Sequence, residues 1–546
     1  MSTLPRATAS ADCVTRDLLE RQAAEFPDKP FALFEDGTSF SYIQTLDRVR
    51  TLAANLRELG VNKGDRVLCW LPNGRHGVCL MLAANHLGAV YAPLNTEYRG
   101  ALLEYAIRLS GARLLIAHAI LVERLQALDL GALEQLVVIG TGAQALEGIE
   151  VWQEDRLSAP ASLPAGFSPL VEPHDIQALI FTSGTTGPSK AVPISYLQSH
   201  VTSTAFSALT ASDRALLNLP MFHVGGMGLA YRMLARGGSI AVVTSFSSST
   251  FWETVRQYEV TTLTLLGAMT SFLLGAPPSM RDRMHPLRHV IMVPVSAQAT
   301  EFAERFGVDI YTVFNMTELA CPIVSERNPS LAGSCGKART GMELRIVDEA
   351  GCDMPDGMPG ELVARSDIPG ALATQYLGNP QATAATWRNG WFHTGDRFRR
   401  DAQGNFYFVD RLKDAIRRRG ENMSASEIEN EIRAFPGVLE SAVIGVPSEH
   451  GEEDVLAAVQ ANPGAEIDPE QLLGFLRNRL PGFMVPRYVR LVVSLPRTPS
   501  QKIMKYQLRA EGVAAGTWDR ESAGIHFRRT RFPGEVPAPQ AEPGAP

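Results

Sequence analysis

The sequence has few features that would indicate a metal centre, a secreted protein or a membrane protein. Its six cysteines form no Cys-X-X-Cys pair and no Cys/His spacing, which argues against a zinc site and a disulfide framework. Residues 1–28 are polar and lack the apolar core of a secretory signal. The longest apolar stretch, residues 78–94, is interrupted by Asn85, His86 and Pro93, so no membrane span is expected. These absences favour a cytoplasmic location.

A strongly basic block is also missing. The net charge is −7 over 546 residues, and the arginine run Arg417, Arg418 and Arg419 is short and followed by Glu421. Nucleic-acid binding requires a broader positive face, so nucleic acid is not expected as a partner. The hydrophobic share of 45% is ordinary for a soluble globular protein, and the length exceeds one core, which predicts two or more domains.

The stretch 182–190 carries the first sign of a binding site. It follows the apolar run 176–181, which predicts a buried strand, and strand ends are where open parallel sheets bind ligands. Its glycines and hydroxyls supply donors for an anion, and its lysine adds a point charge. The candidate residues are Thr182, Ser183, Gly184, Thr185, Thr186, Gly187 and Lys190. Their composition predicts a polyphosphate site.

The spacing of this stretch excludes a Walker A loop. That motif places four residues between its glycines and a lysine directly after the second glycine. Here Gly187 follows Gly184 by three positions, and Pro188 and Ser189 separate it from Lys190. On this stretch alone, a polar surface loop without function stays the alternative.

Strands and helices alternate over the first three hundred residues, which predicts parallel sheets with helices on their faces. An Asp-Gly turn at 36–37 predicts a hairpin within 29–42. Helices are expected at 41–60, 77–87 and 100–110, and strands at 67–71, 89–94, 113–117, 136–139, 216–220, 239–243, 261–266, 289–293 and 309–314.

The pattern changes twice further along the chain. Two short apolar runs, 343–347 and 361–364, flank a segment rich in Gly, Pro and Asp, which predicts a hairpin-rich β module. After Asp410, helices are expected at 426–435 and 469–479, and strands at 441–446, 455–460 and 488–493. The predicted fold class is therefore α/β: a large N-terminal α/β domain with layered sheets and a β module (1–410), a small mobile α+β C-terminal domain (411–515), and a disordered tail (516–546).

Five segments, in this order, resemble the adenylate-forming superfamily of acyl-CoA synthetases, luciferases and carrier-loading adenylation domains. They are 182–190, Phe314-Asn315-Met316-Thr317-Glu318, 391–396 (Trp-Phe-His-Thr-Gly-Asp), 410–414 with 420–422, and 496–502. The run Gly-Asn-Pro-Gln-Ala-Thr at 378–383 is most similar to the acyl-CoA synthetase branch, particularly its crotonobetaine/carnitine-CoA ligase-like members.

The resemblance implies an ATP- and Mg²⁺-dependent carboxylic acid–CoA ligase. A carboxylate would attack the α-phosphorus of ATP, release pyrophosphate and form an acyl-AMP, which CoA then converts to acyl-CoA and AMP. Two alternatives stay open: transfer to a carrier-protein pantetheine or another nucleophile, and an inactive nucleotide-binding scaffold. Arg419 and Gln501, which stand where relatives have glycine, keep the first of these open. A homodimer would also be in keeping with the family.

The resemblance assigns catalytic roles to four residues. Glu318, beside Thr317, would hold Mg²⁺, which proteins bind through one or two carboxylates together with phosphate oxygens. Lys502 would reach the carboxylate and the α-phosphate from a mobile loop. His223 would lie beside the acyl carbonyl. Without the resemblance, Thr317 and Glu318 would read as a helix cap and Lys502 as a solvated surface residue.

The remaining assignments concern the nucleotide, the hinge and CoA. Phe314, with Asn315 and Met316, would face adenine, and Asp396 would accept from the ribose hydroxyls. The three positions in the C-terminal part are Arg411 near ribose and phosphate, Lys413 at the hinge, and Gly420 beside the pantetheine path.

The acyl pocket is expected near residues 223–227, 293–297 and 319–323. These segments are mainly small and apolar, which indicates a modest, largely apolar acid. A carnitine-type acid would require an aromatic or acidic cage around its quaternary ammonium group. The sequence places no such cage.

Overall fold

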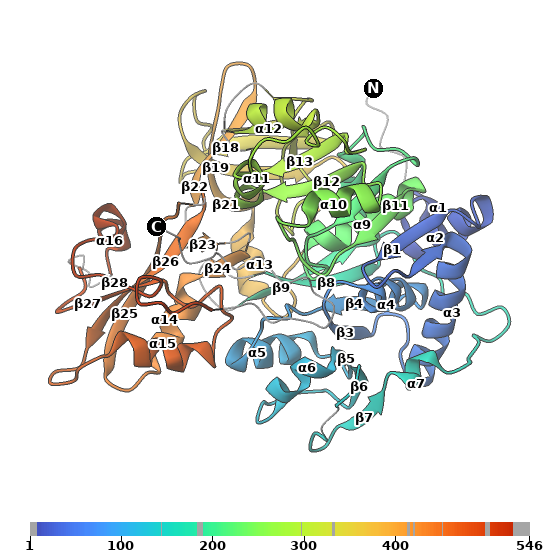
Figure 1. Ribbon diagram of the computed structural model, residues 1–546, viewed down its shortest axis with the longest axis horizontal. Helices are drawn as coiled ribbons and strands as arrows, with labels where there is room; N and C mark the ends of the chain where they lie inside the picture. Colours follow the sequence, from blue (N-terminus) through green and yellow to red (C-terminus); the bar gives the residue numbers. More distant parts are fainter. Residues whose placement is uncertain are drawn as a thin grey trace.

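The computed structural model describes residues 8–142, 145–182, 189–295, 298–329, 333–411, 415–418, 421–449, 451–496 and 503–527. Two sheets with helices between and outside them form the part up to Tyr311, an antiparallel sheet follows, and the C-terminal elements lie to one side (Figure 1). The predicted α/β class with a separate C-terminal region is confirmed.

The first sheet ends at the predicted polyphosphate stretch. Its strands are parallel except for the last pair, in which β9 runs antiparallel to β8 with Thr182 opposite Lys190. The order across the sheet is β7 (Glu150–Gln153), β6 (Gln135–Ile139), β5 (Leu114–His118), β3 (Arg66–Trp70), β4 (Val90–Pro93), β8 (Ile176–Thr182) and β9 (Lys190–Ser195). Strand β9 was not among the sequence predictions.

The second sheet is parallel except for the predicted hairpin β1–β2 at one edge. Its order is β14 (Asp309–Tyr311), β13 (His289–Val293), β12 (Thr262–Leu266), β10 (Arg214–Leu217), β11 (Ser239–Val242), β1 (Pro30–Phe34) and β2 (Ser39–Ser41). Strands β10 and β11 are buried along nearly their whole length, because helices cover both faces of the sheet.

Helices between the two sheets form the largest core. They are α2 (Thr15–Glu25), α3 (Tyr42–Glu58), α4 (Arg75–His86) and α9 (Val224–Arg236). Helix α3 starts where predicted because the Ser41 side chain caps the Gln44 N–H and the Gln44 side chain returns to the Ser41 N–H. The outer faces are covered by α5 (Gly100–Ser110) and α6 (Ala119–Val122) on the first sheet, and by α10 (Phe251–Gln257) and α12 (Ala299–Phe306) on the second. The result is a layered sandwich.

The predicted hairpin-rich module is an antiparallel sheet that carries residues of three of the recognised segments. Its strands are β15 (Val313–Phe314), β16 (Ile323–Val324), β17 (Ser334–Ala338), β22 (Asn405–Arg411), β21 (Trp391–Arg400), β19 (Gly360–Ser366) and β18 (Met342–Val347), with β20 (Trp387–Arg388) paired to β21. Helix α13 (Pro380–Thr386) precedes β20, and α8 (Tyr196–Thr204) contributes Leu197 and Val201 to the core of this sheet.

The C-terminal region begins with the hairpin β23 (Ala415–Arg418) and β24 (Glu421–Ser424). Next come α14 (Ala425–Arg433), β25 (Val438–Pro447), β26 (Glu453–Ala461), α15 (Pro469–Arg477), β27 (Tyr488–Val492), α16 (Lys505–Glu511) and β28 (Trp518–Asp519). The tail predicted from residue 516 differs at its start, because β28 pairs with β27 and Arg520 is buried. Residues 528–546 lie outside the described part.

The C-terminal region packs against the first sheet's side of the molecule, where α5 faces α15 (Figure 1). Leu102 of α5 packs on the C-terminal core, and a Cβ at Gly100 would touch the backbone of Arg479. Among the described residues, no helix has both the length and the apolar content needed to cross a membrane.

Candidate active site

Lys190, Tyr376 and Glu318 form one contact chain at the end of the polyphosphate stretch. The Tyr376 hydroxyl donates to Glu318 Oε1 at 2.7 Å, and Lys190 Nζ lies 4.4 Å from the centre of the Tyr376 ring. Both Tyr376 and Glu318 are 6% exposed. Burial, and then the neighbouring Glu318 charge, raise the pKa of the Tyr376 phenol well above its usual value. The phenol therefore stays protonated and is a permanent donor to the carboxylate.

Helix α8 fixes the backbone of the Thr317–Glu318 segment. Gln198 Nε2 donates to the carbonyl oxygens of Thr317 and Leu319, at 2.8 and 3.2 Å. The Ala373 N–H donates to the Glu318 carbonyl, which ties the segment to the loop that carries Tyr376. These bonds hold the Glu318 carboxylate facing the strand pair that begins at Lys190.

The residues expected to face the nucleotide lie on the antiparallel sheet. Asn315 Oδ1 accepts from the Cys321 N–H at 2.8 Å, so Asn315 shapes the turn after Glu318. The Phe314 ring packs edge-on against Phe398, with 4.8 Å between centroids. Asp396 is 4% exposed on β21, opposite Arg411 of β22. The sheet thus brings together Phe314, Asp396 and the Arg411 backbone, which are far apart in sequence.

His223 precedes α9 and contacts the C-terminal region. Its Nε2 lies 2.8 Å from Oε2 of Glu421, the first residue of β24. Burial alone lowers the pKa of His223, but the charge and hydrogen bond of Glu421 outweigh it and raise the pKa above the usual value. The turn that presents His223 depends on Gly226, because a Cβ there would overlap the carbonyl oxygens of Leu219 and Pro220.

A second carboxylate of the C-terminal region reaches the polyphosphate stretch. Glu427 Oε1 accepts from the Ser189 N–H at 2.8 Å and from the Ser189 hydroxyl at 3.0 Å. Both side chains are buried. Burial raises the pKa of Glu427 to about 7, although the bonds from Ser189 favour the charged form. A carboxylate therefore occupies donors at the end of a stretch expected to bind phosphate.

Several predicted residues fall outside the described part of the chain. They are Ser183, Gly184, Thr185, Thr186, Gly187, Lys413, Gly420 and Lys502; the side chain of Arg411 is also not described. The described members form two groups. One is Thr182, Lys190 and Glu318, at β8 and β9. The other is Phe314 and Asp396 on strands of the antiparallel sheet, with Met316 packed against its core. His223 lies at the start of α9, under the C-terminal hairpin.

The Glu318 position fits a magnesium ion accompanied by phosphate. Within the described ranges, no cluster of three or more His, Cys, Asp or Glu side chains is arranged to hold a metal by itself. Magnesium takes one or two protein carboxylates and completes its shell with waters and substrate phosphates. A single buried carboxylate beside Lys190 matches that requirement.

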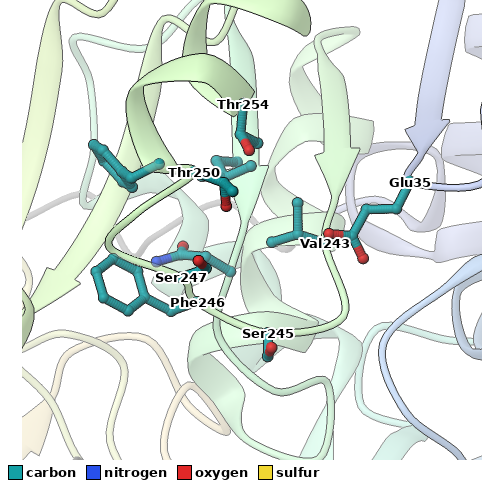
Figure 2. Close-up of a pocket in the computed structure, with 10 residues that line it drawn as sticks. Glu35, Val243, Ser245, Phe246, Ser247, Thr250 and Thr254 are labelled. Carbon is teal, nitrogen blue, oxygen red and sulfur yellow. The ribbon is translucent and has the colours of Figure 1, made fainter. Parts of the chain in front are cut away.

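A pocket beside the second sheet contains none of the predicted site residues. It lies at the ends of β10 and β11 and beside α10, and Figure 2 shows hydroxyl groups and the Phe246 ring around it. Its one carboxylate, Glu35, already accepts from the N–H and hydroxyl of Thr244. Without a basic residue, this pocket does not suit a phosphate.

The sequence reading missed Tyr376, Gln198, Glu421 and Glu427 as functional residues. Tyr376 stands two positions before the Gly-Asn-Pro run that was recognised, and Glu421 belongs to the recognised 420–422 segment. Their closeness to recognised motifs in the sequence was the signal that could have identified these two residues. Gln198 and Glu427 lie on helices and are distinguished only by their tertiary contacts.

Comparison with known proteins gives consistent matches over most of the chain. The AMP-binding enzyme family matches residues 19–377, and the AMP-binding enzyme C-terminal domain matches residues 427–502. Crotonobetaine/carnitine–CoA ligase of Escherichia coli O45:K1 (strain S88 / ExPEC) is 30% identical over 483 residues, covering 86% of this chain and 93% of that protein.

Two solved structures show the same fold. The o-succinylbenzoate CoA synthetase of Bacillus subtilis, a double mutant bound to a product analogue, has a TM-score of 0.78 at 21% identity, covering 91% of this chain and 98% of that chain. The amide bond synthetase McbA of Marinactinospora thermotolerans has a TM-score of 0.76 at 26% identity, covering 90% and 99%.

The chain therefore belongs to the AMP-binding enzyme family. Within it, the chain is an AMP-forming carboxylic acid–CoA ligase, which uses ATP to make an acyl-adenylate and passes the acyl group to CoA. The resemblance read from the sequence is confirmed.

Proposed function

We propose that the structure has the arrangement used for the second half-reaction, the transfer of the acyl group to CoA. The observation that supports this best is the contact between His223 and Glu421. It brings Glu421 of hairpin β23–β24, which follows the sequence position expected to line the pantetheine path, to the residue expected beside the acyl carbonyl. With Glu421 as its partner, the His223 imidazole is held away from the acyl carbonyl.

The segment after Lys502 lies elsewhere in this arrangement. Ile503 and Leu508 pack on the core between β25, β26 and α16, and Lys505 Nζ pairs with Glu429 of α14 at 2.8 Å. Figure 1 shows α16 at the end of the C-terminal region remote from the two large sheets. Adenylation by Lys502 then requires the C-terminal region, taken as 411–515, to turn about Lys413.

For adenylation we propose that Lys190 and Glu318 receive the phosphates of ATP. Lys190 contributes positive charge, and Glu318, held by Tyr376, binds the magnesium ion that neutralises phosphate charge. Thr182, Ser183, Gly184, Thr185, Thr186 and Gly187 supply donors, Phe314 with Asn315 and Met316 faces adenine, and Asp396 and Arg411 bind the ribose. Thr317 and His223 position the reacting groups.

We also propose a reducing, cytoplasmic location. All six cysteines are free, and Cys13, Cys69 and Cys79 are buried. Burial raises the pKa of the Cys79 thiol to about 12, so it is inert rather than a disulfide donor.

Because Lys502 is assigned to adenylation and Glu421 to thioester formation, variants of the two residues should have opposite defects. Lys502→Ala should lower ATP–pyrophosphate exchange by about 10²–10³ while sparing thioester formation from supplied acyl-AMP. Glu421→Gln should spare exchange and slow thioester formation by about tenfold, because a bond between charged groups is lost. Glu154→Gln is a matched control, since Glu154 pairs with His76 at 2.9 Å outside the site. Equal loss of both half-reactions in both variants would refute the assignment.

A further inference from the structure

Helix α9 carries a buried arginine without a counter-ion. Arg232 is 7% exposed, and no hydrogen bond or ion pair reaches it from the described residues. Its guanidinium carbon lies over one neighbour, 3.7 Å from the centre of the Phe206 ring. Burial lowers the pKa of Arg232 to about 10, which leaves it charged at neutral pH. A buried, unpaired cation is unfavourable unless an anion completes the site.

Two further arginines lie near this position: Arg236 is close enough to lower the pKa of Arg232, and Arg339, like Arg232, neighbours Cys321. Arg236 donates to the carbonyl oxygens of Ser203 and Phe206, and Arg339 donates to those of Val201 and Ala320. The Nε atoms of Arg232, Arg236 and Arg339 are all buried without a hydrogen-bond partner. Within the described ranges, no carboxylate lies at ion-pair distance from any of the three. The cluster is therefore a region of positive charge without a carboxylate paired to it in the described part of the chain.

The arginine cluster lies beside two segments that flank the expected acyl pocket, helix α9 and residues 319–321, at the end of α9 away from His223. Helix α9 begins directly after His223, and side chains on a helix lean toward its N-terminus, so Arg232 leans back over Gly228. A Cβ at Gly228 would meet no atom within 4 Å, so space opens at that turn. The other wall of the expected acyl pocket is the segment 319–321, which follows Glu318. Cys321 is close enough to Arg232 to affect its pKa, and Arg339 donates a hydrogen bond to the Ala320 carbonyl.

We propose that the acid activated by this protein carries a second carboxylate, which binds Arg232 at the distal end of the acyl pocket. This inference rests on the proposed function and names its substrate class. Guanidinium groups bind carboxylates with two parallel hydrogen bonds, and Arg232 has its donors uncommitted. The nine residues from His223 to Arg232 span about 13.5 Å, of which the arginine side chain takes up about half. The two carboxylates then lie about 7 Å apart, as in a medium-length dicarboxylic acid.

The same cluster disfavours a quaternary ammonium acid of the kind named for the Escherichia coli relative. Such a head group requires π faces or carboxylates around it. Here the Phe206 face is already covered by Arg232, and two further guanidinium groups would repel a second cation. We therefore expect the distal end of the acyl pocket to bind a different chemical group from that in the relative, despite the 30% identity.

The test compares dicarboxylic acids with their monomethyl esters. ATP–pyrophosphate exchange is measured with adipate, pimelate, suberate and an aromatic dicarboxylate, each against its monomethyl ester and against crotonobetaine. For the best acid we expect kcat/KM to exceed that of its ester by about 10²-fold, because the ester leaves Arg232 unpaired. Arg232→Met should lower kcat/KM for the diacid about 10²-fold, mainly through KM, and leave the ester unchanged or improved.

Arg57→Met is the matched control. The Arg57 guanidinium also packs on an aromatic ring, 4.5 Å from the centre of Phe167, but on α3 and away from the site. It should change neither substrate. Arg232→Met should also raise the melting temperature, because it removes a buried unpaired charge, whereas an arginine with a structural partner would lower it. An ester equal to its diacid, a preference for crotonobetaine, or identical kinetics in Arg232→Met would overturn the proposal.

A direct binding measurement separates this proposal from the ligase function. Calorimetric titration of the wild-type protein and Arg232→Met with the same diacids needs no catalysis. If no acid supports exchange but a diacid binds the wild type and not Arg232→Met, the ligase assignment fails and the anion site stands. If exchange proceeds only with monocarboxylic acids and no diacid binds, the anion site fails and the ligase assignment stands.

Discussion

Tyr376→Phe tests the coupling between the phosphate and magnesium positions. The substitution keeps the ring under Lys190 Nζ, 4.4 Å away, and removes only the hydroxyl that donates to Glu318 Oε1 at 2.7 Å. Both partners are 6% exposed, so water does not readily replace the lost donor. A hydrogen bond to a charged group contributes about 1.5–3 kcal/mol, and about 1.4 kcal/mol corresponds to a tenfold change in rate.

We therefore expect Tyr376→Phe to lower kcat/KM for ATP–pyrophosphate exchange by about 10–100-fold. The magnesium concentration for half-maximal exchange should rise, because Glu318 is no longer held in place. Thioester formation from supplied acyl-AMP should be unchanged, since that half-reaction does not require the β- and γ-phosphates.

Tyr42→Phe is the control for loss of a buried tyrosine hydroxyl. Tyr42 donates to the Gly238 carbonyl at 2.6 Å in the core between the sheets. This variant should lose about 1 kcal/mol of stability and no exchange activity. Wild-type exchange and magnesium dependence in Tyr376→Phe, or an equal loss in Tyr42→Phe, would refute the reasoning.

Two further predictions concern the contact of the C-terminal region and the turn before α9. The folded-state pKa of Glu427, about 7, lies above its ordinary value of 4.5, so its contribution to docking of the C-terminal region is complete below pH 4.5 and declines as the pH rises to 7. Glu427→Gln should abolish this pH dependence. Hydrogen exchange over α14 between pH 5 and 8 measures it. An unchanged pH profile in that variant would contradict the assignment. Gly226→Ala should destabilise the protein by about 1–3 kcal/mol in chemical denaturation, because its Cβ overlaps the Pro220 carbonyl. Gly228→Ala should lower the free energy of unfolding by less, because a Cβ there meets no atom within 4 Å. A larger loss in Gly228→Ala than in Gly226→Ala would contradict this account.

Much of the fold follows from local patterns. Helix α3 has apolar residues at helical spacing and a capping box, and hairpin β1–β2 has an Asp-Gly turn, so both were predicted within a few residues of their observed bounds. The antiparallel course of β9 was missed because its apolar run contains a proline and continues directly into α8. The short strand β28 was missed because its pairing with β27 depends on tertiary contacts rather than on an apolar run.

In the candidate site, too, residues within sequence motifs were predictable and residues defined only by tertiary contacts were not. Lys190, Glu318 and Asp396 lie in segments whose composition and order were readable. Tyr376 joins Glu318 across 58 positions, and Glu427 joins Ser189 across 238, so their pairing emerges only when the sheets are assembled. Arg232 is likewise unremarkable in sequence, and only its burial without a counter-ion marks it.

The most direct test of the account follows oxygen from the acid into AMP. The enzyme is incubated with ATP, CoA, magnesium and acids from the dicarboxylate panel labelled with ¹⁸O in both carboxylates, and the products are analysed by mass spectrometry. Attack of the carboxylate on the α-phosphorus predicts one ¹⁸O atom in AMP, formed in equal amount with acyl-CoA. Label in inorganic phosphate together with ADP, or unlabelled AMP, would contradict an acyl-adenylate intermediate.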